Sequence, residues 1–213
     1  MTLERLFDAA SVAVVGASRT PTKRGYQAIR TLIDDGYAGA IHPVNPKETE
    51  ILGLPCHPSV SAIEGPVDLA LITTPARTLP AVLRDCGAKG VAAAVIIAGG
   101  FGEMGAEGRA LEEQVAAVAE EAGVRFVGPN TSGMINVPRR MNLVGMPDVP
   151  QGDISLLSQS GNMALALVNE AQQRGQQGFR YYVGVGNEAD LRFHEYLSYP
   201  VSYTHLTLPT KTE

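Results

Sequence analysis

Short apolar runs alternate along the chain with longer stretches in which apolar residues recur at helical spacing. The runs are bounded by Gly, Pro or Asn and cover residues 11–15, 40–44, 67–72, 91–97 and 124–127. A run that is apolar throughout is typical of a parallel strand whose two faces are both covered by helices. We therefore predict five buried parallel strands in the first 137 residues.

The stretches between these runs have the pattern of amphipathic helices. They predict three helices, over residues 26–35, 79–87 and 107–122. In the last of them, Leu111, Val115, Val118 and Ala122 recur at steps of three and four residues, which places them on one helix face. Strands and helices that alternate in this way form right-handed βαβ units. The predicted fold class is α/β, with a Rossmann-like doubly wound parallel sheet.

The pattern is interrupted after residue 137 and then starts again. Residues 138–152 contain three prolines and two glycines, which suits a linker with one short strand near residues 141–144. Beyond it, residues 154–158 and 179–185 predict strands, and residues 161–174 and 189–199 predict helices. We therefore expect a first domain over residues 1–137, a linker over 138–152 and the first part of a second α/β domain over 153–200.

Residues 201–213 have a different character. The string VSYTHLTLPT at residues 201–210 resembles the translation of a transposon adapter used to prepare sequencing libraries. We expect residues 201–213 to be translated adapter, and sequences of this kind are left out of fold predictions. On this interpretation the natural second domain is truncated near residue 200. A natural, strand-forming tail is the alternative.

Composition narrows the function classes. The net charge of −5 gives no general reason to expect a nucleic acid as partner. Cys56 and Cys86 are the only cysteines and lack CxxC spacing, so neither a metal site nor a disulfide framework is indicated, and a reducing cytosol fits best. No stretch reaches the roughly 18 apolar residues that span a bilayer. We expect a cytoplasmic protein without a membrane partner.

The loop after the first strand has the composition of an anion site. Gly16 permits a tight turn, Ser18 offers a hydroxyl, and Arg19, Lys23 and Arg24 place three positive charges within six residues. Backbone N–H groups at the start of the following helix attract anions. The loop therefore predicts phosphate binding, with a solvated basic turn as the alternative.

Further loops follow the other predicted strands at the same edge of the sheet. They carry Asn45 and Lys47, Thr74 and Pro75, Gly99 and Gly100, and Asn130. Each loop alone contains residues that are common in ordinary turns, so a single loop would not indicate a binding site. Together they predict a site for an extended nucleotide, because ligands of open α/β sheets bind at the carboxyl ends of the strands. A nicotinamide dinucleotide is disfavoured, since the loop lacks GxGxxG and no acidic residue directly ends the second strand.

The second domain carries a separate candidate site. The sequence SQSGN at residues 158–162 follows a predicted strand and opens a helix. The hydroxyls of Ser158 and Ser160, with N–H groups near Gly161, would suit a phosphoryl group. A plain capping serine is the alternative. The GNEAD sequence at 186–190 predicts a turn that Asp190 organises, without a role in chemistry.

As an ordered set, these motifs carry a resemblance. The strings VVGAS, HPVNPK, LITTP, IIAGGFGE, FVGPNTSG, LLSQSGNMA and VGVGNEADL make residues 5–200 similar to the α portion of NDP-forming acyl-CoA synthetases. This is the ADP-forming acetate–CoA ligase group, which is related to succinyl-CoA synthetase. The resemblance implies a CoA-binding domain followed by a flavodoxin-like domain. The implied CoA-binding residues are Gly16, Ser18, Arg19, Lys23, Gly25, Asn45, Lys47, Thr74, Pro75, Gly99, Gly100 and Asn130.

The resemblance also implies a reaction. The family interconverts acyl-CoA, ADP and phosphate with a carboxylic acid, CoA and ATP through a phosphohistidine. The resemblance also implies an ATP-grasp partner that binds ADP or ATP with Mg, and an oligomeric state for the complete protein. The phosphohistidine belongs to a later stretch, and His42, His57, His194 and His205 offer no substitute, so we expect no turnover by this chain alone. The alternative is a CoA-binding regulatory region of a protein acyltransferase, or a stand-alone CoA-binding module.

Overall fold

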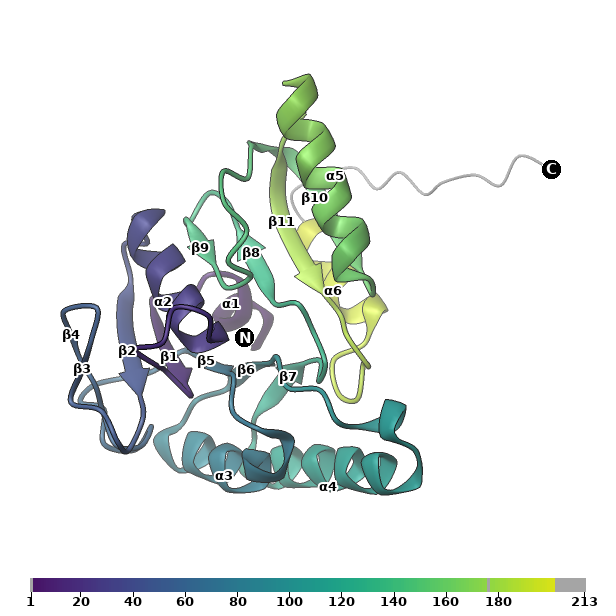
Figure 1. Ribbon diagram of the computed structural model, residues 1–213. Coiled ribbons are helices and arrows are strands. Elements are labelled where there is room, and N and C mark those ends of the chain that lie inside the picture. Colours follow the sequence, from purple (N-terminus) through teal and green to yellow (C-terminus); the bar gives the residue numbers. More distant parts are fainter. Residues whose placement is uncertain (1, 176, 202–213) are drawn as a thin grey trace.

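The computed structural model describes residues 2–175 and 177–201 and contains two main sheets (Figure 1). The first has the strand order β2-β1-β5-β6-β7, and all its neighbouring strands are parallel. Its strands are β1 (Ser11–Val15), β2 (Ala40–Val44), β5 (Leu69–Ile72), β6 (Ala93–Ile96) and β7 (Arg125–Val127). The five predicted strands and the doubly wound α/β class are therefore confirmed.

Helices cover both faces of this sheet. The helices α3 (Leu79–Lys89) and α4 (Ala106–Ala122) lie on one face, and α1 (Thr2–Phe7) and α2 (Arg24–Asp34) lie on the other (Figure 1). Glycine at positive φ ends α3 at Gly90 and α4 at Gly123, where residues with a Cβ are disfavoured. The six-residue helix α1 was not predicted. Short elements complete this part: β3 (Glu50–Ile51), β4 (Leu54–Pro55), η1 (Ala76–Thr78) and η2 (Gly102–Met104).

The second sheet is smaller and mixed, in the order β10-β11-β8-β9. It contains β10 (Gln151–Ser158), β11 (Phe179–Gly184), β8 (Met134–Asn136) and β9 (Met141–Asn142). Helix α5 (Gly161–Arg174) connects the parallel strands β10 and β11, whereas β8 runs antiparallel to β11. Strand β8, within residues 1–137, thus pairs with a strand from residues 153–200. The domain boundaries at 137 and 152 remain predictions.

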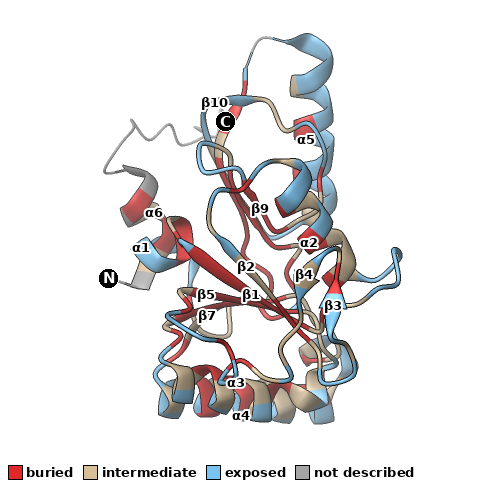
Figure 2. Ribbon diagram, turned by 90° about the vertical axis from the view of Figure 1, so that its left-hand side faces the viewer, coloured by how far each residue is buried: buried red, intermediate tan, exposed pale blue. Residues whose placement is uncertain are grey.

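The two sheets share one apolar core. Phe7 of α1 stacks on Tyr199 of α6 (Phe193–Val201) with ring centroids 4.5 Å apart, and contacts Tyr181 of β11 edge to face at 5.2 Å. Figure 2 shows buried residues along the strands and where α1 lies beside α6. A second cluster fills the space between the first sheet and α3 and α4. Burial of this shared core holds the second sheet against α1 and α2.

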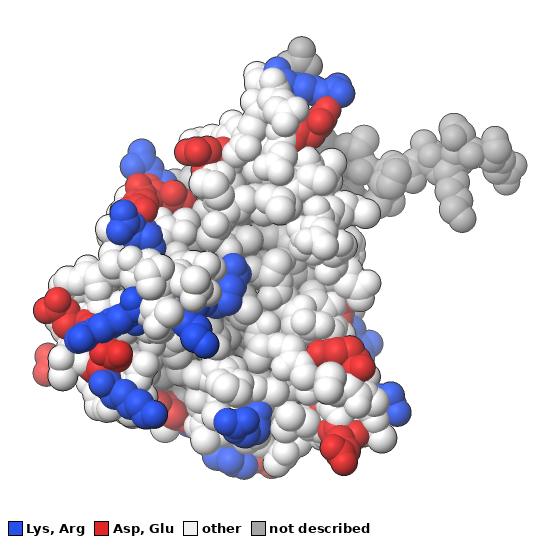
Figure 3. Space-filling view, viewed as in Figure 1, with Lys and Arg blue, Asp and Glu red and all other residues white. Residues whose placement is uncertain are grey.

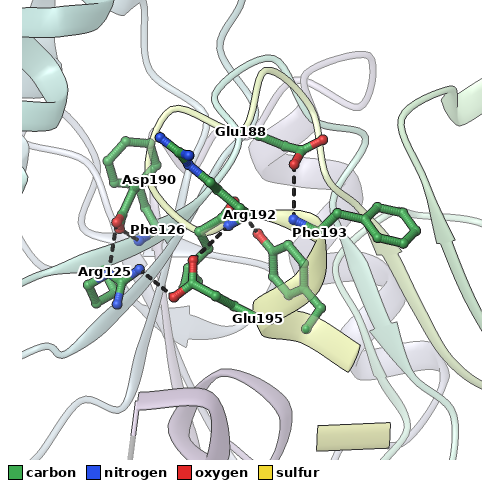
Figure 4. Close-up of polar contacts among 9 residues, drawn as sticks. Arg125, Phe126, Glu188, Asp190, Arg192, Phe193 and Glu195 are labelled. Carbon is green, nitrogen blue, oxygen red and sulfur yellow. Dashed lines mark hydrogen bonds and ion pairs between the residues drawn. The ribbon is translucent and has the colours of Figure 1, made fainter. Parts of the chain in front are cut away.

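A network of polar contacts attaches the turn after β11 to the edge strand β7 (Figure 4). Asp190 accepts hydrogen bonds from Arg125 Nε and from the backbone N–H of Phe126, both at 2.7 Å. Arg125 also contacts the Glu195 carboxylate at 2.9 Å. The prediction that Asp190 organises this turn is confirmed. Helix α6 begins later than the predicted 189, because residues 187–191 hydrogen-bond to the backbone of residues 126–130 instead.

Two predictions made for the tail fall on residues outside those described. These are the interpretation of residues 201–213 as translated adapter, of which only residue 201, at the end of α6, is described, and the expectation that His205 offers no substitute for the phosphohistidine. In the described part of the chain, every helix is too short or too polar to cross a bilayer.

Candidate functional site

Three loops meet where β1, β2 and β5 end. Gly16 has a φ of +88°, and its N–H and that of Ala17 donate to Val44 O at 3.0 and 3.2 Å. A Cβ added at Gly16 would lie 2.7 Å from Thr73 Oγ1, closer than real side chains approach. Glycine is therefore required here both by the backbone conformation and by the contact with the loop after β5.

Helix α2 begins directly on the loop after β1. A Cβ added at Gly25, in the first turn of α2, would overlap the carbonyl oxygen of Gly16. Ser18 accepts a hydrogen bond from the N–H of Thr20 at 3.1 Å, which shapes the loop between them. This close approach brings the N-terminus of α2, where helix N–H groups lack helical partners, up to the end of β1.

Asn45 connects the loop after β2 to the loop after β1. Its Nδ2 donates to Ala17 O at 2.7 Å, and its Oδ1 accepts from the N–H of Lys47 at 2.9 Å. Both ends of the side-chain amide are thus engaged with backbone groups. Asn45 fixes the positions of Ala17 and Lys47 in this structure.

The basic residues of these loops have different surroundings. Arg19 pairs with Glu48 at 2.8 Å and also donates to Glu50 O at 3.0 Å. Lys23 and Lys47 are exposed, and within the described residues neither forms an ion pair. Figure 3 shows several basic side chains on the face that carries α2 and the β3–β4 hairpin. Lys23 and Lys47 therefore remain available to an anion.

Arg24 points inward instead of toward the anion site that the sequence predicted for it. Its Nη1 donates to Val144 O at 2.8 Å and its Nη2 to Ser132 O at 3.0 Å. Burial of the guanidinium lowers the pKa of Arg24. Ser132 and Val144 lie 108 and 120 residues further along the chain, so no local pattern around Arg24 contained this contact.

A pocket of about 400 Å³ opens between these loops and α3. Its lining includes Gly16, Asn45, Thr74 and Pro75, together with apolar atoms of Val15 and other side chains. Thr74 Oγ1 accepts a hydrogen bond from Thr78 Oγ1 at 2.9 Å. The structure thus brings four predicted site residues into one largely apolar cavity.

Gly99, Gly100 and Asn130 form a neighbouring group at the ends of β6 and β7. Gly100 has a φ of +101°, and a Cβ added there would lie 3.8 Å from Ala76, next to Pro75. Asn130 donates its N–H to Ala98 O at 2.8 Å. Glu103 accepts from the N–H of Gly100 at 2.5 Å, a bond that lowers the pKa of this carboxyl group. None of Gly99, Gly100 and Asn130 lines the pocket, and Gly100 comes near it only through Ala76, the chain neighbour of the lining residue Pro75.

The predicted phosphoryl site lies at the N-terminus of α5. Ser160 caps the helix by accepting from the N–H of Met163 at 3.3 Å, and Ser158 Oγ contacts the backbone of Ser160. The capping interpretation of Ser160 is therefore confirmed, and phosphoryl binding remains a prediction. Gly161 lies against Ser132, because an added Cβ would come 3.0 Å from the Ser132 Cβ. Sequence reasoning missed Ser132, which the fold brings beside Gly161 from the loop after β7.

Comparison with known proteins gives two family matches. Residues 10–136 match the model of a CoA binding domain, and residues 151–207 match that of a succinyl-CoA ligase like flavodoxin domain. The first match covers more than half of the chain.

Individual relatives agree with these matches. The α subunit of acetate–CoA ligase [ADP-forming] I of Pyrococcus furiosus is 43% identical over 196 residues, which are 90% of this chain and 42% of that protein. Acetate–CoA ligase [ADP-forming] I of Archaeoglobus fulgidus is 43% identical over 92% of this chain and 28% of its own. The dinucleotide forming acetyl-coenzyme A synthetase 1 of Ca. Korarchaeum cryptofilum, solved with phosphate and ADP, has a TM-score of 0.89 and 40% identity, covering 94% of this chain and 43% of that one. The chain thus spans less than half the length of each relative.

Proposed function

The chain belongs to the CoA binding domain family and is similar to the α portion of ADP-forming acetate–CoA ligases, and on this premise we propose that it supplies the CoA site of such a ligase. The site consists of the loops after β1, β2, β5 and β6. The ligase names of the relatives favour this function over a regulatory or stand-alone CoA-binding module.

One observation carries the proposal. A mostly apolar pocket is lined by Gly16, at the start of the loop that leads to Lys23, and by Pro46, the chain neighbour of Lys47. Both lysines are exposed, and no ion pair of the described residues includes either of them. The one carboxylate in the lining, Asp85, accepts hydrogen bonds from the backbone N–H groups of Val60 and Ser61. CoA combines an adenine ring and a hydrocarbon-rich arm with phosphate groups, so it needs both kinds of surface. Apolar walls favour the first by excluding water, and ammonium groups favour phosphates through charge-assisted hydrogen bonds.

Each group of predicted residues has a distinct part in this proposal. Lys23 and Lys47 bind phosphate groups, and Arg19, paired with Glu48, has a weaker role. Gly16 and Gly25 let the loop after β1 pack against the loop after β5 and against α2, and Gly99 and Gly100 leave room for CoA to approach the backbone. Ser18, Asn45 and Asn130 hold the loops in shape, and Thr74 and Pro75 form a wall of the pocket.

For the whole protein we propose the reversible reaction of acyl-CoA, ADP and phosphate to a carboxylic acid, CoA and ATP. ADP or ATP with Mg binds to an ATP-grasp portion, fused or separate, that also supplies subunit contacts. The acid is a small carboxylic acid. The contribution of α5 is an N-terminus whose free N–H groups, near Gly161, face the phosphoryl oxygens, with Ser158 and Ser160 fixing the turn before it.

Calorimetric titration of the whole chain with CoA tests the proposal. Lys23→Ala and Lys47→Ala should each weaken CoA binding about ten- to hundredfold, because a charged hydrogen bond contributes about 1.5–3 kcal/mol. Lys89→Ala is the charge-matched control, since Lys89 ends α3 and donates to Ile63 O instead. A wild-type chain that does not bind CoA, or equal affinities in all three variants, would contradict the assignment.

A further inference from the structure

The segment at residues 56–61, which we call the strap, forms one wall of the pocket. Pro58 and Ser59 line the cavity, and the strap contains neither a helix nor a full strand. On the side of α3, Asp85 accepts a hydrogen bond from the N–H of Val60 at 2.7 Å. The shape of this wall therefore depends on a few contacts between the strap and its neighbours.

His57 attaches the strap to the end of β2. Its N–H donates to Pro43 O and its carbonyl oxygen accepts from the N–H of Asn45, both at 2.9 Å. His57 thereby forms a single parallel bridge with Val44, and the next residue of the strap is the lining residue Pro58. Val44 and Asn45 line the same pocket. Loss of this bridge would separate two parts of the pocket lining.

The same bridge holds two imidazole rings close together. The ring of His42, on β2, lies edge to face with that of His57, with a centroid distance of 5.7 Å and an interplanar angle of 63°. Lys89, at the end of α3, is a third cationic group near this pair. Burial of the ring, followed by the charges of His57 and Lys89, lowers the pKa of His42. A positive charge on His42 is therefore unfavourable in the folded chain.

The carboxylates around the strap do not neutralise this cluster. Asp85 of α3 is engaged with backbone N–H groups of the strap, and Glu48, after β2, pairs with Arg19 at 2.8 Å. Glu64, beyond the strap, is exposed, and β1 places Ala13 beside His42. In the described part of the chain, neither histidine of the pair takes part in an ion pair.

We propose that the strap wall of the CoA pocket is sensitive to pH, since the strap is held firmly on β2 while His42 and His57 are uncharged and is loosened when both gain a proton. Two charged imidazoles would lie side by side near Lys89, and their repulsion opposes the bridge at His57. The inference rests on the proposed function, which assigns this pocket to CoA.

The direction of the effect follows from proton linkage. The pKa of His42 is lower in the folded chain than in a chain whose strap is detached and whose ring is solvated. The detached form therefore binds more protons, and acidification through the ordinary histidine value of about 6.5 favours it. The attachment is strongest above this value and is lost progressively below it.

Calorimetric titration of the whole chain with CoA, at about pH 7.5 and at about pH 5.5, tests this dependence. On acidification, the dissociation constant should rise about three- to tenfold more in the wild type than in His42→Gln, whose side chain does not gain a proton. Titration of the CoA phosphates contributes equally to every variant. His194→Gln is the matched control, because His194 is exposed on α6, and it should behave as the wild type.

Amide hydrogen exchange locates the effect. After correction for the intrinsic rates, the N–H groups of Asn45 and His57 should lose protection at the lower pH in the wild type and keep it in His42→Gln. Equal pH dependence of CoA binding in these two proteins, or unchanged protection at both amides, overturns the pH dependence alone. A wild type that does not bind CoA at the higher pH overturns the proposed function, and the exchange measurement then still tests the strap. If His42→Gln does not fold, His57→Gln removes the same charge pair from the other side and should show the same reduced pH dependence.

Discussion

At the scale of single residues, the site depends on positions where a side chain is missing. Gly16 and Gly25 allow the end of β1, the loop after β5 and the first turn of α2 to approach one another. Gly16 requires glycine through its positive φ as well, whereas Gly25 has ordinary helical geometry. At Gly25, close contacts with the backbone of Gly16 and Ala17, and not the backbone conformation, oppose a larger residue.

We expect Gly25→Ala to lower the free energy of unfolding by about 1–3 kcal/mol, because the new Cβ forces α2 away from the loop. The helix propensity gained by alanine, at most about 1 kcal/mol, offsets only part of this cost. Urea unfolding measures the change. Gly102→Ala is the control, since a Cβ there has no neighbour closer than 3.6 Å. Equal stabilities of the two variants would contradict the contact.

At the scale of elements, the ion pairs of the chain differ in what they connect. Asp34 joins Arg30 within the exposed surface of α2. Asp190 joins the turn after β11 to Arg125 and to a backbone N–H of β7, and its side chain is only 21% exposed. Because Asp190 connects the two sheets, its loss detaches the turn after β11 from β7. Loss of Asp34 releases only the side chain of Arg30 on the surface of α2.

Asp190→Ala should therefore lower the free energy of unfolding by about 1.5–3 kcal/mol, the range for hydrogen bonds to a charged group. Asp34→Ala should cost no more than about 0.5 kcal/mol, as is usual for exposed helix pairs. Denaturant unfolding of both variants gives the comparison. Similar losses in the two would show that the turn is held by its backbone contacts alone.

Elements also show what the sequence could and could not predict. The five parallel strands were predictable because strands buried on both faces are continuous apolar runs. Helix α1 and strand β8 were missed because six and three residues are too few to show a periodicity. The inward turn of Arg24 and the contact of Ser132 with Tyr182 depend on residues far apart in the chain, which no local pattern records.

At the scale of the whole molecule, the two sheets differ in how far other elements cover them. The first sheet has helices on both faces, whereas in the described part of the chain β10 is an edge strand of the second sheet, with no strand paired to its outer side. Near it, α5 buries only Ala164 and Val168, and Met163, Leu165 and Leu167 are 43–60% exposed. An open strand edge beside exposed apolar side chains favours pairing with another chain.

We expect this chain to self-associate through β10 at high concentration. Ile154→Lys, which places a charge on this edge strand, should weaken self-association about tenfold, or 1.4 kcal/mol. Ile33→Lys is the control, because Ile33 is similarly exposed but lies on α2. Sedimentation equilibrium of the three proteins measures the effect. A wild type that stays monomeric, or equal effects of both lysines, would rule out this edge.

The seam between residues 126–130 and 187–191 consists largely of main-chain hydrogen bonds, such as those from the N–H groups of Asn187, Ala189 and Leu191. Main-chain groups are the same whatever side chain a residue carries. The seam therefore tolerates changes of side chain on both sides, except at Asp190, whose carboxylate holds Arg125 and the Phe126 N–H, and at Gly186, where a Cβ would overlap Pro129 O. Elsewhere along the seam, the side chains of residues 187–191 can change without loss of the main-chain hydrogen bonds that attach this turn to β7 and the loop after it.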